Sequence, residues 1–202
     1  MKLIGQISED EVISEFLMGE VNSSRFGKNI INNLKKDKKP KKIIIKPNLK
    51  NKKENLSRKK LLGKIRGFGK NKKIFENFPK EIIWNKAIFD KKELKKVRYI
   101  DYSYWNELSN KSRLPIEAVK KISKGEKAYD VSNDGFFEIL SVIKQKKKFP
   151  KMIFVAKNKK SRIVVLEGHA RLTAYFLASR YIPKEMEVII GFSEKIINWD
   201  LY

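Results

Sequence analysis

Apolar and polar positions along this chain alternate between helical and strand-like spacing, which predicts an α/β protein of the α+β type. Segment 8–18 places its apolar residues on one helical face, behind a Ser8 and Glu11 pair that has capping-box spacing. Helices are also predicted over residues 28–34, the first part of 50–73, 116–123, 136–146 and the segment after Gly168. Strands are predicted over residues 82–89, 97–105, 152–156, 163–166 and 186–191, and residues 43–45 are either a short strand or an extended connection.

The junction between strand 163–166 and the following helix is the most informative point in the chain. The strand ends at Glu167, and a single glycine, Gly168, separates it from the helical pattern. A helix start presents unpaired backbone N–H groups and the positive end of the helix dipole, so it attracts anions. Arg171 and Thr173, about one turn into the helix, would add donors for phosphate oxygens. The junction therefore predicts a phosphate site, although a strand, one glycine and a helix also meet in α/β proteins without one.

Glu167 and His169 are the titratable residues at this turn. Glu167 would sit at the mouth of the turn, where a metal, a ribose hydroxyl or a substrate proton is within reach. His169 is the only histidine, and the chain has no cysteine, so neither a second histidine nor a thiolate is available for a zinc site. We therefore predict no protein-held metal and no disulfide.

Residues 136–191 follow the order helix, Phe149-Pro150, strand, polar turn, strand, Gly168-His169-Ala170-Arg171, helix and strand. This order resembles the N-terminal domain of ParB proteins, in the superfamily shared with sulfiredoxin. The four-residue motif falls where ParB proteins have Gly-Glu-Arg-Arg and sulfiredoxins have Gly-Cys-His-Arg. The resemblance implies a small mixed sheet with flanking helices over residues 81–202, and it leaves residues 1–80 as a basic, partly helical N-terminal extension.

The resemblance implies a nucleotide as ligand, a nucleoside triphosphate or diphosphate with Mg²⁺. Its phosphates would lie on Gly168, His169, Arg171 and Thr173. Some members of the superfamily transfer or hydrolyse phosphate, which would give Glu167 or Asp134 a catalytic role as a base or metal ligand. Sulfiredoxin chemistry is excluded because the chain has no cysteine, and His169 and Ala170 replace two residues of the ParB motif, so CTP is not implied.

Net charge points to a second class of partner. The chain has 47 basic and 23 acidic residues, a net charge of +24, which favours a polyanion such as DNA. Only eight of the 47 are arginine, and the sequence is also rich in Ile and Asn, as codon bias in an AT-rich genome would produce. The alternative function is therefore a DNA-binding module that uses the basic N-terminal half and keeps the ParB-like domain as a scaffold.

Segment 64–73 is the strongest candidate for nucleic-acid contact, because it places five positive charges and two glycines around one aromatic residue. The predicted contacts are Lys64, Arg66, Phe68, Lys70, Lys72 and Lys73. In a second interpretation Phe68 folds back onto the core while the lysines stay in water. In a third, the segment closes over a nucleotide at Gly168.

Three other polar or aromatic groups have two interpretations each. In loop 20–27, Glu20 and Arg25 either join the site or serve with the loop's hydroxyls to start the next helix, and the second is favoured. Tyr102, Tyr104 and Trp105 either stack on a base or belong to the core, and the core is favoured. Asp134, with Ser132 and Asn133, is expected to cap a helix, with metal binding as the alternative.

No apolar run is long enough to span a bilayer, and the acidic residues near the N-terminus are unlike those of a secretory signal. We therefore expect a cytoplasmic protein without a membrane partner.

Overall fold

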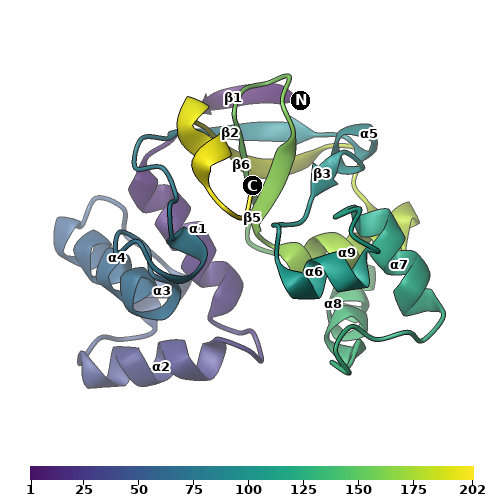
Figure 1. Ribbon diagram of the computed structural model, residues 1–202. Coiled ribbons are helices and arrows are strands. Elements are labelled where there is room, and N and C mark those ends of the chain that lie inside the picture. The colour runs from purple at the N-terminus through teal and green to yellow at the C-terminus, as the bar shows by residue number, and fades with distance from the viewer.

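A six-stranded mixed sheet forms the centre of the protein in the computed structural model, which describes all residues from 1 to 202 (Figure 1). The strands are β1 (Lys2–Gln6), β2 (Ile83–Phe89), β3 (Val97–Arg98), β4 (Ile153–Ala156), β5 (Ile163–Glu167) and β6 (Met186–Phe192). They lie in the order β1-β2-β6-β4-β5-β3. The pairs β4 and β6, and β3 and β5, run parallel, and the other neighbours run antiparallel. The predicted α+β class is confirmed.

The central strands are short apolar runs buried on both faces. All four residues of β4 are buried, as are the residues of β5 after Ile163. β2 and β6 pair without a register shift, from Ile83 opposite Phe192 to Phe89 opposite Met186. Strand β1 differs from these strands because it is an exposed edge strand. The sequence did not predict it, because its residues do not alternate between buried and exposed positions.

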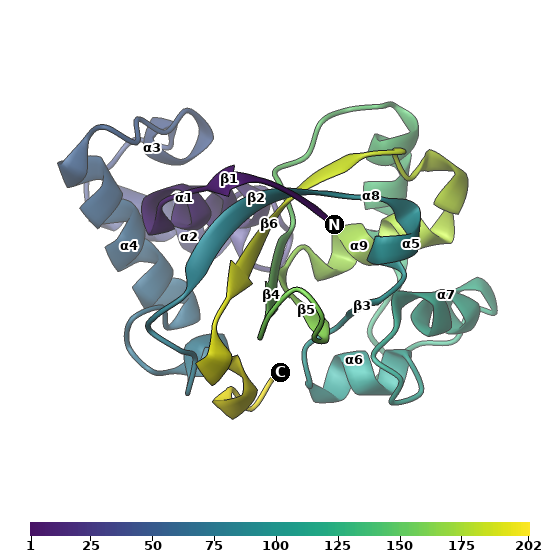
Figure 2. The same cartoon turned by 90° about the horizontal axis from the view of Figure 1, so that it is seen from above.

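Nine α-helices pack around the sheet. They are α1 (Glu9–Glu20), α2 (Gly27–Lys36), α3 (Lys42–Ile45), α4 (Lys52–Arg66), α5 (Lys91–Leu94), α6 (Ser103–Leu108), α7 (Pro115–Ser123), α8 (Asp134–Lys144) and α9 (His169–Leu177). Helices α1 to α4 gather on one side of the molecule and α6 to α9 on the other, with the sheet between them (Figures 1 and 2). None of these helices has both the length and the hydrophobicity that a bilayer span requires.

Local signals placed most of the helix starts correctly. The Ser8 hydroxyl accepts a hydrogen bond from the Glu11 amide at 3.3 Å, which confirms the predicted start of α1. At α8, the N-cap residue Asn133 makes no capping hydrogen bond with its side chain; the Ser132 hydroxyl accepts from the Asp134 amide at 3.1 Å, and the Asp134 side chain is exposed.

Two segments differ from the prediction: 43–45, expected as a short strand or an extended connection, is helical, and strand 97–105 is correct only at its start. Segment 43–45 lies within a single helical turn, α3, whose carbonyl at Ile43 accepts a 2.8 Å hydrogen bond from the buried guanidinium of Arg58. Segment 97–105 forms only the two-residue strand β3, and its last three residues begin α6. Ile43 and Ile44 pack into the core from α3, and Trp105 packs into it from α6, whereas Val97, Tyr99 and Ile100 are buried outside any helix.

One hydrophobic core runs through both halves of the chain. It includes Phe16 of α1 and Leu62 of α4 as well as Val165 of β5 and Val188 of β6. In addition, β1 completes the edge of the sheet by pairing with β2. The predicted units 1–80 and 81–202 therefore share a core and a sheet, and this contact brings α1 and α4 to the end of β5.

Candidate functional site

The predicted strand, glycine and helix meet at the end of β5. Gly168 has a φ of +101°, in the left-handed region, and α9 begins at the next residue. A Cβ atom at Gly168 would lie 2.7 Å from Cγ of Met152, so glycine is required both for its backbone and for the space it leaves. No side chain caps the first turn of α9. The turn therefore presents backbone N–H groups that no side chain of the protein satisfies.

Replacement of Gly168 by alanine is expected to lower the free energy of unfolding by more than the cost of a left-handed backbone conformation alone. Strain costs about 1–2 kcal/mol per residue, and overpacking against Met152 adds about 1–3 kcal/mol. Gly125→Ala is the matched control, because Gly125 has a φ of +77° and nothing within 4 Å of the added Cβ. Urea unfolding of the two variants measures the difference, and equal losses would contradict the close approach of Met152.

Arg171 and Glu167 form a buried ion pair across the turn. The Arg171 guanidinium also donates to the carbonyl oxygen of Pro150, and both charged residues are less than a tenth exposed. Burial raises the pKa of Glu167, and the charge of Arg171 opposes that shift. Gly19 of α1 lies against this pair, since a Cβ there would be 2.7 Å from Glu167 Oε1. The ion pair therefore holds the turn between β5 and α9 and packs against the C-terminal end of α1.

This geometry corrects three predicted roles. Arg171 is engaged by Glu167 and Pro150 rather than free to meet a phosphate, and Glu167 is an ion-pair partner rather than an open carboxylate. Thr173 faces the core, where its hydroxyl donates to the His169 carbonyl at 2.8 Å and lies 2.7 Å from the Tyr99 hydroxyl. Helical spacing correctly placed Arg171 and Thr173 in the first turns of α9, but it did not reveal the residues to which their side chains are hydrogen-bonded.

His169 lies at the first position of α9 with its ring stacked on aromatic residues. The ring centroids of His169 and Trp105 are 5.0 Å apart, and those of His169 and Tyr99 are 6.1 Å apart. Its Nε2 atom is buried and has no hydrogen-bond partner. Burial, reinforced by Arg66, Arg25 and other arginines, lowers the pKa of His169 to about 3. The imidazole is therefore neutral at physiological pH.

The N-terminal helices bring a second group of charges to this turn. Arg66, the last residue of α4, has its Nε atom 3.3 Å from Oε1 of Glu20 at the end of α1. Arg66 and Arg25 both lie over the ring of Phe26, at 4.3 and 5.0 Å from its centroid. Burial raises the pKa of Glu20 to about 8, with Arg66 opposing and Glu167 reinforcing the shift. Glu20 is thus largely protonated at neutral pH.

Both interpretations of loop 20–27 hold in part. Ser23 serves the local turn, since its hydroxyl accepts from the Phe26 amide at 3.0 Å and donates to the Glu20 carbonyl at 2.9 Å. The charges of Glu20 and Arg25 nevertheless act on the residues around His169. We call Glu20, Arg25, Arg66, Glu167, His169 and Arg171 the turn cluster.

The turn cluster contains three buried polar atoms that have no hydrogen-bond partner. They are Oε2 of Glu20, Nε2 of His169 and Nε of Arg66, which lies 3.3 Å from Oε1 of Glu20 but without the geometry of a hydrogen bond. Buried polar atoms in folded proteins are nearly always paired with protein or with ordered water. Three such atoms beside an uncapped helix start therefore indicate a place for a polar ligand or for water.

Aromatic residues at the start of α6 border the turn cluster. Trp105 is buried beneath His169, which is the core role that was favoured. Tyr102 is 45% exposed, and burial lowers the pKa of Arg66, a shift that the nearby Tyr102 phenol is among the groups to oppose. Tyr104 is half-buried, and its pKa responds to burial first and then to Arg25. The two tyrosines thus lie near Arg25, in the turn before α2, and Arg66, at the end of α4.

Segment 64–73 is placed differently from the predicted nucleic-acid loop. Phe68 is half-buried with its ring edge-to-face against Phe75, 5.0 Å between centroids, so it folds onto the core. Lys64 pairs with Asp37, and Lys73 donates to backbone carbonyls at the end of α4. Of the six predicted residues only Arg66 joins the turn cluster, and Lys70 and Lys72 remain exposed without an ion pair.

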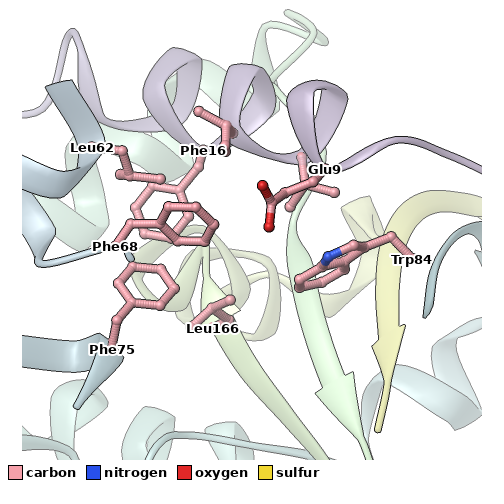
Figure 3. Close-up of a pocket in the computed structure, with 9 residues that line it drawn as sticks. Glu9, Phe16, Leu62, Phe68, Phe75, Trp84 and Leu166 are labelled. Atoms are coloured by element: carbon pink, nitrogen blue, oxygen red, sulfur yellow. The ribbon is translucent and has the colours of Figure 1, made fainter. Parts of the chain in front are cut away.

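Phe68 also lines a small apolar cavity between α1, α4 and the sheet. Figure 3 shows its ring beside Phe16 and Phe75, with Leu166 and Trp84 on the sheet side. The cavity has a volume of about 10 Å³. That is room for about one water molecule, so the cavity is a packing gap and not a ligand site.

Comparisons of this chain with protein-family models, with curated proteins and with solved structures match nothing. The ParB-like interpretation of residues 136–191 accordingly stays a prediction.

Proposed function

We propose that this protein binds a nucleotide at the N-terminus of α9. The observation that carries the proposal is the set of partnerless buried atoms on Glu20, Arg66 and His169 beside the uncapped first turn. A phosphate group would accept hydrogen bonds from the Arg66 Nε atom and from backbone N–H groups of that turn. Protonated Glu20 would donate to a further phosphate oxygen, because its pKa is raised to about 8.

The charge balance of the turn cluster favours an anion. Arg25, Arg66 and Arg171 are positive, His169 is neutral, and Glu167 is already paired with Arg171. Burial strengthens the attraction between the remaining positive charge and a phosphate. Arg25 is exposed, so its guanidinium is free to turn toward a bound phosphate.

The neighbouring tyrosines favour a nucleotide over inorganic phosphate. The exposed ring of Tyr102 offers a surface on which a base stacks, and Tyr104 lies near Arg25. The resemblance of residues 136–191 to ParB-like domains supports the same ligand class. We assign Arg171 and Glu167 to holding the turn and propose no reaction at Glu167.

Arg25→Ala is expected to weaken nucleotide binding without unfolding the protein, because Arg25 is exposed. Loss of one charge-assisted hydrogen bond costs about 1.5–3 kcal/mol, which corresponds to an increase of the dissociation constant by about ten- to hundredfold. Isothermal titration with ATP, ADP, CTP and GTP, each with and without Mg²⁺, measures the change.

Arg180→Ala is the matched control for this titration. Arg180 is also exposed and also lies over a neighbouring ring, 5.1 Å from the centroid of Tyr181, but it is not part of the turn cluster. The control should bind as the wild type does. Absence of binding by every nucleotide, or equal affinity of the Arg25→Ala and Arg180→Ala variants, would overturn the proposal.

A further inference from the structure

The surface of α2, α3 and α4 carries most of the charge surplus of the protein. Residues 28–73 contain seventeen lysines, two arginines and only two acidic residues, Asp37 and Glu54. All seventeen lysines are exposed. Only two of them form ion pairs, Lys59 with Glu9 and Lys64 with Asp37. The other fifteen lysines have no carboxylate partner, so this surface is strongly cationic.

Helix α4 arranges part of this charge along one solvent-facing stripe. Its buried face holds Leu61, Leu62 and Ile65, and its solvent side carries lysines at helical spacing. The exposed lysines of α4 are Lys52, Lys53, Lys59, Lys60 and Lys64. With 15 residues, the helix is about 22 Å long. The stripe therefore spans several phosphates of a nucleic-acid backbone.

A groove between α2, α3 and α4 opens on the same surface. It has a volume of about 380 Å³, and its polar lining includes Lys39, Lys60, Lys64 and Ser57. Asp37 already neutralises Lys64, with its carboxylate oxygens 2.7 and 2.8 Å from Nζ. Lys39 and Lys60 have no carboxylate partner, so two unpaired lysines line the groove.

The amino-acid composition of this surface favours binding of a nucleic-acid duplex over binding of a single strand. Proteins that bind single strands stack bases on exposed aromatic rings. The only aromatic residue in segment 28–73 is Phe68, and its ring packs against Phe75. Lysines without exposed rings contact backbone phosphates, and those contacts carry no sequence information. An exposed helix also fits the wide major groove of B-form DNA, whereas the major groove of A-form RNA is narrow.

We propose that α2, α3 and α4 bind the backbone of double-stranded DNA, with phosphates on Lys39 and Lys60 in the groove and on the lysine stripe of α4. This binding does not rest on the nucleotide site. Neither Lys39 nor Lys60 belongs to the turn cluster, and Figure 1 shows α2, α3 and α4 together on one side of the sheet. The DNA contacts also differ from those predicted from the sequence, since Lys39 and Lys60 lie outside segment 64–73 and the ring of Phe68 packs against Phe75.

Fluorescence anisotropy with a short labelled duplex of mixed sequence tests the proposal. For the wild type, the logarithm of affinity should fall steeply and linearly with the logarithm of salt concentration between about 50 and 200 mM. The double variant Lys39→Gln/Lys60→Gln should bind at least about tenfold more weakly, and the magnitude of its salt slope should fall by about 2. Arg25→Ala should leave DNA binding nearly unchanged.

Lys159→Gln/Lys160→Gln is the matched control, since it removes the same charge from two exposed lysines on the turn between β4 and β5. The control should keep most of the affinity. Equal loss in both double variants would mean that only net charge matters and would overturn the site. Absence of duplex binding at low salt, tighter binding of a single strand, or equal binding of double-stranded RNA would overturn the proposed partner. The Lys39→Gln/Lys60→Gln variant keeps the turn cluster, so its nucleotide binding should be unchanged. Titrating this variant with nucleotide therefore distinguishes a failure of the DNA-binding proposal from a failure of the nucleotide-binding proposal.

Discussion

Arg171→Met is expected to lower the free energy of unfolding by about 3–5 kcal/mol, because it leaves the carboxylate of Glu167 buried without its partner. Both residues are less than a tenth exposed, and Gly19 of α1 closes over them. The loss of the hydrogen bond to the Pro150 carbonyl adds to the cost. Urea unfolding followed by tryptophan fluorescence measures the change in free energy.

A double variant identifies the cause of that loss. Glu167→Gln/Arg171→Met removes both charges, so it should recover most of the stability that the single variant loses. Lys195→Met is the surface control, because Lys195 and Glu81 pair at 3.2 Å with side chains 68% and 83% exposed. Breaking such a pair costs less than about 1 kcal/mol. A loss for Arg171→Met no larger than that of Lys195→Met would show that the buried pair does not hold the turn.

The stability of the protein is expected to fall as the pH rises from 6.5 to 8, and Glu20 is the main cause. Its pKa is raised from 4.5 to about 8 in the folded protein, chiefly by burial. The folded state therefore keeps a proton that the unfolded state has lost, and stability from this group is present below pH 4.5 and is lost as the pH rises to about 8. The full loss is about 4–5 kcal/mol at 1.36 kcal/mol per pH unit.

His169 acts in the opposite direction on the acidic side. Its pKa is lowered from 6.5 to about 3, chiefly by burial, so the stability it contributes is lost as the pH falls through that range. Between pH 4.5 and 6.5 the two groups change the stability in opposite directions and cancel. Above pH 6.5 the fall of stability with pH is therefore due to Glu20. Burial also raises the pKa of Glu167 above 4.5, so this group too contributes stability at low pH that is lost as the pH rises.

Glu20→Gln should flatten the alkaline limb of this profile and raise the stability at pH 8. The wild type should lose about 2 kcal/mol from pH 6.5 to 8, and the variant should lose clearly less. Glu138→Gln is the control, because Glu138 is exposed and has no ion pair. Unfolding free energies across this range check the result, and an unchanged slope in Glu20→Gln would contradict a buried, protonated Glu20.

Local pattern was sufficient for the elements that frame the turn. Short β-branched runs predicted β4, β5 and β6, and the change of period at Gly168 predicted α9, because both signals lie within a few consecutive residues. Pattern failed for β1 and α3, whose conformations depend on β2 and on Arg58, far away in the sequence. Tertiary contacts decided these two segments.

The turn cluster itself was only partly predictable. Its Glu20 and Arg66 come from the ends of α1 and α4, about a hundred residues and more before Glu167 in the sequence, and no periodicity connects positions so far apart. One signal was present, since Glu20 lies between Met18 and Val21 in a largely apolar stretch that indicates burial. Arg171 shows the converse, because its position was predicted correctly and its partners were not.

An amide NMR titration of the ¹⁵N-labelled protein with nucleotide tests the central claim most directly. The proposed site requires the backbone N–H groups of His169, Ala170 and Arg171, in the first turn of α9, to meet the phosphates. We expect large shifts of these amide resonances that saturate with ligand and that weaken in Arg25→Ala. Shifts confined to other parts of the chain, or no shifts with any nucleotide, would contradict the account.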